Sequence, residues 1–336
     1  MLSSAQLQEF ANNYGIPLWG LDASIALVLA VAVFCLCGLG VVVLVYMERK
    51  IAADFQIRYG PLHVGWHGSL QLVADILKLI TKEDVFPKKA DPWIFRLAPA
   101  IVFLAAFVGL LVMPIGPGLV VQDLNVGLIY VLAIPSIGIA GLIMAGFGSY
   151  NKYAMMGSLR AAAQMVSYEI PRALSVIGVV MIAGSAKLSA IVGAQGIWHI
   201  ILQPLGFMVF LVSTLAELNR TPFDLPDTEA ELVAGFSMEY SGMRFAFFFF
   251  GEYIALMAAS ALTVVLFLGG WHGPGPEFLA PVWFLIKTFG VIFLAMWIRW
   301  TLPRFRIDQV MDLGWKVLLP LALLNILITG IVMLII

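Results

Sequence analysis

The chain has 336 residues, of which 62% are hydrophobic and 12% are charged, and its formal net charge is −1. This composition differs strongly from that of an average soluble domain and indicates a membrane protein with several spans. The nearly neutral charge gives no indication of a nucleic-acid partner. The two cysteines, Cys35 and Cys37, exclude a disulfide framework and an iron–sulfur cluster held by four cysteines of this chain.

Eight apolar runs are long enough to cross a bilayer, because a helix needs about 20 apolar residues to span a core roughly 30 Å thick. None of them alternates with a period of two, so we predict helices and not barrel strands. The runs cover about 23–46, 94–113, 127–147, 160–184, 197–215, 245–268, 282–300 and 317–336. The sequence therefore predicts an all-α fold that forms a single integral membrane domain over residues 1–336.

Basic residues cluster in the loops that follow the odd-numbered runs, which hold 17 of the 19 lysines and arginines. The positive-inside rule therefore predicts that these loops are cytoplasmic and that both termini lie outside. The first of them, residues 47–93, is long enough to be structured. In it, Leu70, Val73, Leu77 and Ile80 form an apolar stripe at helical spacing, which predicts an amphipathic helix at the membrane surface or against the spans.

Three carboxylates fall inside or at the end of predicted spans, where an unpaired charge is costly. Glu169 lies in the fourth run, Glu217 closes the fifth, and Glu252 lies seven residues into the sixth. Arg172, three residues after Glu169, is a possible partner on the same helix. The three acids can form one proton-exchanging cluster, and the alternative for each of them is a structural ion pair.

The predicted cytoplasmic loop 216–244 is unusually acidic. Pro222 and Pro226 keep the residues between them extended, and the sequence from Thr228 to Glu231 fits a helix capping box. Capping explains one or two of the acids and leaves a surplus beside a single basic residue, Arg220. The acids of this stretch are Glu217, Asp224, Asp227, Glu229, Glu231 and Glu239.

Five segments of the chain resemble the H subunit of respiratory complex I, the counterpart of mitochondrial NADH dehydrogenase subunit 1. They are "MERKIAADFQIRYGP", "GSLQLVADILKLITKED", "RAAAQMVSYEIPRA", "AELNRTPFDLPDTEAELVAGFSMEYSGMRFAFFFFGEY" and "WIRWTLPRFRIDQVMDLGWK". The resemblance runs in order from about Glu48 to the C-terminus. The sequence departs from the usual motif in two places: Leu62 and His63 replace an asparagine and a basic residue, and Asp227 replaces a commoner glutamate.

The resemblance implies a membrane subunit of proton-translocating NADH:quinone oxidoreductase, which lines the quinone channel and begins an acidic proton path. By motif, the quinone-channel residues would be Glu48, Arg49, Arg58, Asp75, Phe223, Asp224 and Arg299. The proton-transfer residues would be Glu169, Glu217, Asp227, Glu229, Glu231, Glu239 and Glu252.

The sequence contains no dinucleotide-binding loop, no P-loop and no metal-ligand spacing. We therefore expect no complete redox site on this chain. Quinone would be the substrate, and NADH, flavin and iron–sulfur clusters would be bound by partner subunits. The expected partners are the other subunits of complex I and the lipid bilayer, in the cell (inner) membrane if the source is bacterial.

Three alternatives remain at this point. One is the related subunit of a membrane-bound hydrogenase-type complex, because the redox partner is not written in this chain. Another is a stand-alone proton- or cation-coupled transporter, since carboxylates within spans also mark ion paths. The absence of a visible internal repeat and the scarcity of broken-helix signals weaken it. The third is a non-catalytic scaffold whose acidic loop docks a basic partner.

Overall fold

The computed structural model describes residues 18–226 and 233–335, and within them the fold is built from helices. In that part of the chain an isolated bridge joins Gly116 to Leu119, and no strand is formed. The longer helices are α2 (Leu18–Phe55), α3 (Gln71–Thr81), α4 (Pro92–Leu111), α5 (Gly127–Gly148), α6 (Lys152–Ala183), α9 (Pro204–Glu217), α11 (Gly242–Phe267), α12 (Ala280–Thr301) and α14 (Leu319–Ile335). The shorter elements are η1 (Trp66–Gly68), α7 (Leu188–Gly193), α8 (His199–Leu202), η2 (Gly235–Ser237), η3 (Glu277–Leu279), α13 (Ile307–Asp312) and η4 (Leu313–Leu318), a π-helical turn.

Seven of the helical stretches described are long and apolar enough to cross a membrane. They agree with the predicted runs, except that the fifth run, at 197–215, is broken into α8 and α9. Pro204 begins α9, and Gln203 before it has φ −133° and ψ 61°. A residue before proline is disfavoured in the helical region, so the helix cannot run through this point. The 14 residues of α9 reach about 21 Å at 1.5 Å per residue, less than a full span.

Two of the long helices, α4 and α6, begin at side-chain caps. Asp91 accepts hydrogen bonds from the N–H groups of Trp93 and Ile94, at 3.1 and 3.4 Å, and starts α4. Asn151 accepts one from the N–H of Tyr153 at 2.9 Å and starts α6. Gly184, with φ 65°, ends α6 because a residue without Cβ adopts this left-handed conformation easily.

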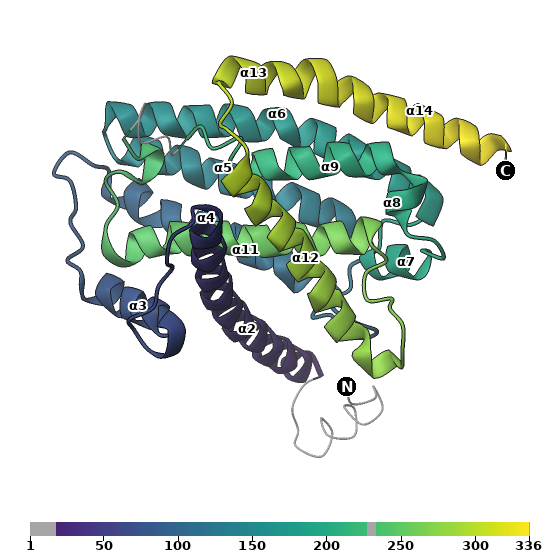
Figure 1. Cartoon of the computed structure of the whole chain (residues 1–336), viewed down its shortest axis with the longest axis horizontal. Coiled ribbons are helices and arrows are strands. Elements are labelled where there is room, and N and C mark those ends of the chain that lie inside the picture. The colour runs from purple at the N-terminus through teal and green to yellow at the C-terminus, as the bar shows by residue number, and fades with distance from the viewer. Residues whose placement is uncertain (1–17, 227–232, 336) are drawn as a thin grey trace.

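Helix α11 lies in the middle of the bundle (Figure 1) and contacts α2, α3, α4 and α12. Figure 1 shows α2 and α12 inclined to α11, while α13 and α14 run along one edge and α14 packs on α6. Nearly every residue from Ser260 to Phe267 is almost inaccessible to solvent. The central helix thus has neighbours on most sides and can bring their side chains together.

Helix α3 occupies most of the predicted amphipathic segment. The apolar stripe recognised in the sequence lies on its outer side, where Leu70, Val73, Leu77 and Ile80 are 54%, 46%, 57% and 56% exposed. Leu72, one residue out of that stripe, is buried. The stripe is therefore free to face lipid or a partner, and a different face of α3 packs on the protein.

Candidate functional site

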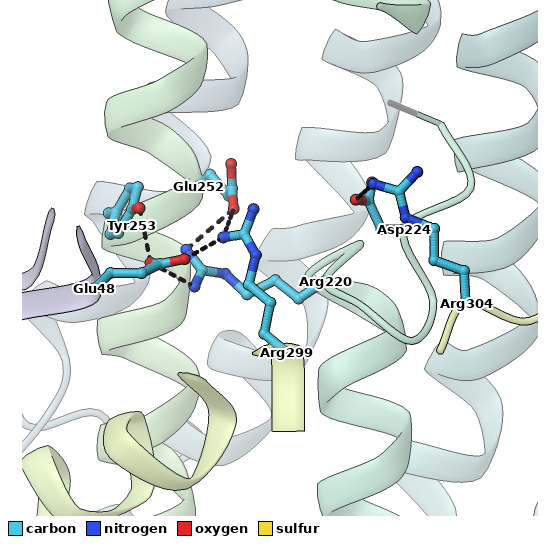
Figure 2. A network of polar contacts seen from close by, with 7 residues as sticks. All are labelled: Glu48, Arg220, Asp224, Glu252, Tyr253, Arg299 and Arg304. Atoms are coloured by element: carbon cyan, nitrogen blue, oxygen red, sulfur yellow. Dashed lines mark hydrogen bonds and ion pairs between the residues drawn. The ribbon is translucent and has the colours of Figure 1, made fainter. Parts of the chain in front are cut away.

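A buried group of charges joins three helices and the segment that follows α9. Arg220 contacts Glu48 of α2 through Nη1 and Glu252 of α11 through Nη2, both at 3.1 Å. Arg299 of α12 contacts Glu48 at 2.5 Å and Glu252 at 3.9 Å. The hydroxyl of Tyr253 donates to Glu48 at 2.8 Å. Figure 2 shows these five residues converging, and we call them the central network.

The centre of the network is deeply buried, since the side chain of Arg220 is 0% exposed and that of Glu48 is 6% exposed, whereas those of Glu252 and Arg299 are 34% and 28% exposed. The guanidinium of Arg220 also lies 4.8 Å from the centre of the Tyr253 ring. Burial by itself lowers the pKa of Arg220, but the charges of Glu252 and Glu48 outweigh it and raise the pKa above its usual value. Arg220 therefore stays charged and holds two carboxylates at one point.

A second ion pair lies beside the network (Figure 2), where Arg304 contacts Asp224 at 3.0 Å. Asp224 is buried, whereas the Arg304 side chain is half exposed. Burial raises the pKa of Asp224, and the nearby charges of Arg304 and Arg299 oppose this effect. Asp224 is thus a carboxyl group whose proton affinity depends on the cations around it.

The three acids predicted to form one cluster each have a different partner, and that of Glu252 is Arg220 in the central network. Glu217 forms a buried ion pair with Arg172, so the partner of Arg172 is on α9 and not Glu169 on its own helix. Glu169 accepts a hydrogen bond from the hydroxyl of Ser136 on α5. A neighbour three residues away on a helix was the nearest candidate in sequence, but the close packing of α6 on α9 brings Glu217 to Arg172 instead.

Two cavities lie among the helices that carry the central network, and network residues line the larger of them. The larger cavity, about 890 Å³, is lined by charged side chains and by apolar residues of α4, α5 and α11. Its charged lining residues are Arg172, Glu217, Asp224, Glu252, Arg299 and Arg304. Since two of these belong to the central network, the larger cavity connects the network to Glu217 and Asp224. Glu169 does not line it.

The smaller cavity, about 520 Å³, lies between α2, α3, α4 and α11 and is mainly apolar. Leu72, Ile76 and Leu79 of α3 line it, opposite Phe247 and Phe250 of α11. Its polar lining residues are Arg49, Asp75 and Lys78. Phe245 and Phe249 line both cavities, so they separate the two spaces.

The other quinone-channel residues expected from the resemblance lie in different surroundings. Arg49 pairs with Asp75 at 2.6 Å beside the smaller cavity. Phe223 is buried between the rings of Tyr168 and Phe305, at centroid distances of 5.6 and 5.7 Å. Arg58, by contrast, is exposed and donates to Gln56 at 2.6 Å.

Glu239 accepts a hydrogen bond from the side chain of Asn151 at 2.7 Å, away from the central network. Asp227, Glu229 and Glu231 lie outside the described residues. Over the part of the chain that is described, no group of three or more His, Cys, Asp or Glu side chains could hold a metal ion.

Three members of these clusters were not among the candidates from sequence: Arg220, Tyr253 and Arg304. Arg220 carries a signal, since it is the one basic residue in an acidic stretch of an apolar chain. Tyr253 and Arg304 carry none, because an aromatic residue in an apolar helix and a basic residue in a loop predicted to be cytoplasmic are both ordinary.

The chain is similar to known proteins over most of its length. A family described as NADH dehydrogenase matches residues 27–330. The protein named as H subunit 1 of NADH-quinone oxidoreductase in Geobacter sulfurreducens is 46% identical over 342 residues, covering 95% of this chain and 97% of that protein. The H subunit of the same enzyme in Anoxybacillus flavithermus is 50% identical over 315 residues, covering 90% and 94%. That of a Geobacillus species is 49% identical over 318 residues and covers 92% of each chain.

Proposed function

This chain belongs to the family of H subunits of NADH-quinone oxidoreductase, and from that premise we propose that its smaller cavity takes quinone and its larger cavity begins a proton path. It is an integral membrane subunit of an oxidoreductase complex, and the other subunits of that complex are its partners. The proposal includes NADH, flavin and iron–sulfur clusters on those partners and a location in the cell (inner) membrane.

The shape and chemistry of the smaller cavity support a quinone tail as its occupant. An isoprenoid tail is apolar, and burying apolar surface contributes roughly 25 cal/mol per Å². The aromatic and aliphatic side chains of α3 and α11 provide that surface. Arg49 and Asp75 provide polar contacts for a head group passing the same cavity.

The observation that carries the proposal is that the central network ties α2, which lines the smaller cavity, to the charged lining of the larger cavity. Glu48 adjoins Arg49 in sequence, and Arg49 lines the smaller cavity. Through Arg220, Glu48 is tied to Glu252, which lines the larger cavity. A charge that appears on one side is therefore transmitted to carboxylates on the other.

The magnitude of this coupling is sufficient to move protons. Two unit charges about 8 Å apart interact by roughly 2 kcal/mol at an effective dielectric constant near 20, which corresponds to about 1.5 pKa units. Reduction of quinone to an anionic form would raise the proton affinity of carboxylates within that range. Protons would then redistribute among Glu252, Asp224 and Glu217, which line the larger cavity.

Glu169 and Ser136 support a continuation of the path into a neighbouring membrane subunit. Ser136 is exposed and Glu169 half-buried, although both lie on apolar helices, α5 and α6. A carboxylate facing lipid is costly, so a protein partner at this face is favoured. In the proposal, protons leave the chain here toward subunits that resemble antiporters.

A photoreactive quinone tests the quinone half of the proposal. An analogue with a diazirine on its tail is illuminated in the assembled complex, and the labelled peptides are identified by mass spectrometry. We expect labels in 72–79 and 245–250, because these segments line the smaller cavity, and we expect excess natural quinone to prevent them. Labels confined to lipid-facing α14, or labels that natural quinone does not displace, would contradict the proposal.

A further inference from the structure

Gln164 is a buried side chain of α6 that binds the segment carrying two of the cavity carboxylates. It is 1% exposed. Its amide nitrogen donates to the backbone oxygen of Ala216 at 2.7 Å and to that of Phe223 at 2.8 Å. The side-chain oxygen of Asn219 accepts a third, longer hydrogen bond at 3.1 Å.

The two backbone oxygens have a specific position in the chain. That of Ala216 belongs to the peptide group that leads into Glu217, and that of Phe223 belongs to the one that leads into Asp224. Both carboxylates line the larger cavity. One amide group thus fixes the peptide groups from which both side chains extend.

Besides the ion pairs of Arg220, the turn between these peptide groups is held by local backbone bonds and by one bond from outside, in which the N–H of Phe305 donates to the oxygen of Pro222 at 3.0 Å. The N–H of Asn219 donates to Ala216 at 3.2 Å and that of Phe223 to Arg220 at 2.8 Å, and both bonds close local turns. Asn219 has φ 50°, a left-handed conformation that asparagine adopts more readily than most residues other than glycine. Gln164 connects the start of this turn to its end, and Arg220 of the central network lies between them.

Within the described part of the chain, the side-chain hydrogen bonds of Gln164 are made by its nitrogen and not by its oxygen. The nitrogen has two hydrogens for three acceptors, whereas the side-chain oxygen is buried and has no partner among the described residues. The group is therefore held as a donor. We infer that Gln164 is a positioning residue that sets where Glu217 and Asp224 stand in the larger cavity; this inference rests on the proposed function.

A substitution of Gln164 by glutamate isolates the donor. Gln164→Glu keeps the size of the side chain, but only the protonated acid can donate, and it donates one hydrogen bond. An ionised glutamate would place a charge against two backbone oxygens, which strongly disfavours it, so its pKa would be raised. The variant should therefore work at low pH and fail at high pH. Gln164→Met, which is similar in size and donates nothing, should fail at every pH.

The matched control is Gln195→Glu. Gln195 is also buried, and its nitrogen donates to the backbone oxygens of Val265 and Leu266 at 2.7 and 3.2 Å. It lines neither cavity. A general cost of placing a glutamate against two buried backbone oxygens appears in this control too, although the side-chain oxygen of Gln195 also accepts a hydrogen bond from the N–H of Gly269 at 2.8 Å.

At each pH, the rate of coupled quinone reduction of the variant is divided by that of the wild type, because the native titrating groups are present in both. The titratable or charged groups near Gln164 along α6, at the end of α9 and in the turn are Arg160, Tyr168, Glu169, Arg172, Glu217, Arg220 and Asp224. On the C-terminal helices that pack on α6 they are Asp308, Asp312 and Lys316.

The experiment uses the assembled complex in proteoliposomes and measures quinone reduction and protons pumped per electron. NADH oxidation by a water-soluble artificial acceptor serves as the assembly control. For Gln164→Glu we expect coupled quinone reduction to fall about tenfold near pH 8, the factor for one lost buried hydrogen bond, and to recover toward about pH 6. Gln164→Met should show the loss throughout, and Gln195→Glu should show no such pH-dependent loss.

Wild-type coupling in Gln164→Glu across this range would overturn the inference, as would a pH-independent loss shared equally with Gln195→Glu. If a variant does not assemble, Gln164→Asn is measured instead. Its shorter amide should lose coupling in part, and full coupling would contradict the inference. Glu217→Gln distinguishes a failure of the proposed function from a failure of the positioning role. Normal pumping in Glu217→Gln refutes the proposed function. Impaired pumping in Glu217→Gln, together with normal pumping in the Gln164 variants, refutes only the positioning role.

Discussion

Arg220 contacts two carboxylates from different helices with the two arms of one guanidinium. Lysine cannot replace it, because an ammonium is a point charge without the planar fork that reaches two acceptors at once. The pair with Glu48 is buried on both sides, so this carboxylate has little water to replace a lost partner. At the scale of single residues, the site depends on this shared cation and on the proton affinity of Asp224, which burial raises.

Arg220→Lys tests the shared cation. Removing one partner of a buried ion pair costs about 3–5 kcal/mol, so we expect quinone reduction by the assembled complex to fall by about tenfold or more. The matched control is Arg306→Lys, since the pair of Arg306 with Asp308 at 2.7 Å is 77% and 59% exposed. Exposed pairs contribute little, so this control should retain activity. Equal activities of the two variants would contradict the role of Arg220.

At the scale of elements, the apolar periodicity predicted the helices but not the way they face. The stripe of α3 at Leu70, Val73, Leu77 and Ile80 has the expected spacing, yet it lies on the exposed side. The other face, with Leu72, Ile76 and Leu79, is also apolar and lines the smaller cavity. Pattern alone cannot choose between two apolar faces. The break before Pro204 was readable in principle, because proline is disfavoured beyond the first turn of a helix.

Substitutions on the two faces of α3 test whether the smaller cavity binds the quinone tail. Ile76→Trp fills part of the smaller cavity, whereas Leu77→Trp adds the same bulk on the exposed stripe. We expect the first to raise the KM for long-tailed quinones several-fold and to affect short-tailed quinones less, because the tail competes with the indole for space. The second should leave both KM values unchanged. The same KM in both variants for both quinones would exclude the smaller cavity as the tail site.

At the scale of the whole molecule, the site joins residues that are distant in the sequence. Glu48 lies 172 residues from Arg220 and 251 from Arg299, and no spacing rule predicts such pairs. The family resemblance named Glu48, Glu252 and Arg299 as candidates, but it placed the first and last in a quinone channel and the second in a proton path. The packing of α2, α11 and α12 puts all three in one network. Local patterns thus identified the helices and several acids, whereas tertiary packing decided which acids share a cation.

The central claim, that one buried network couples quinone reduction to the acidic cavity, is tested most directly by Glu252→Gln. Protons pumped per electron are measured in proteoliposomes, with NADH oxidation by an artificial acceptor as the assembly control. The exposed Glu277, in η3, provides the matched variant Glu277→Gln. We predict that Glu252→Gln lowers the ratio of protons pumped to electrons transferred and that Glu277→Gln keeps it. Of these two glutamates, Glu252 is the one that contacts Arg220 and lines the larger cavity. An unchanged ratio in an assembled Glu252→Gln complex would contradict the claim.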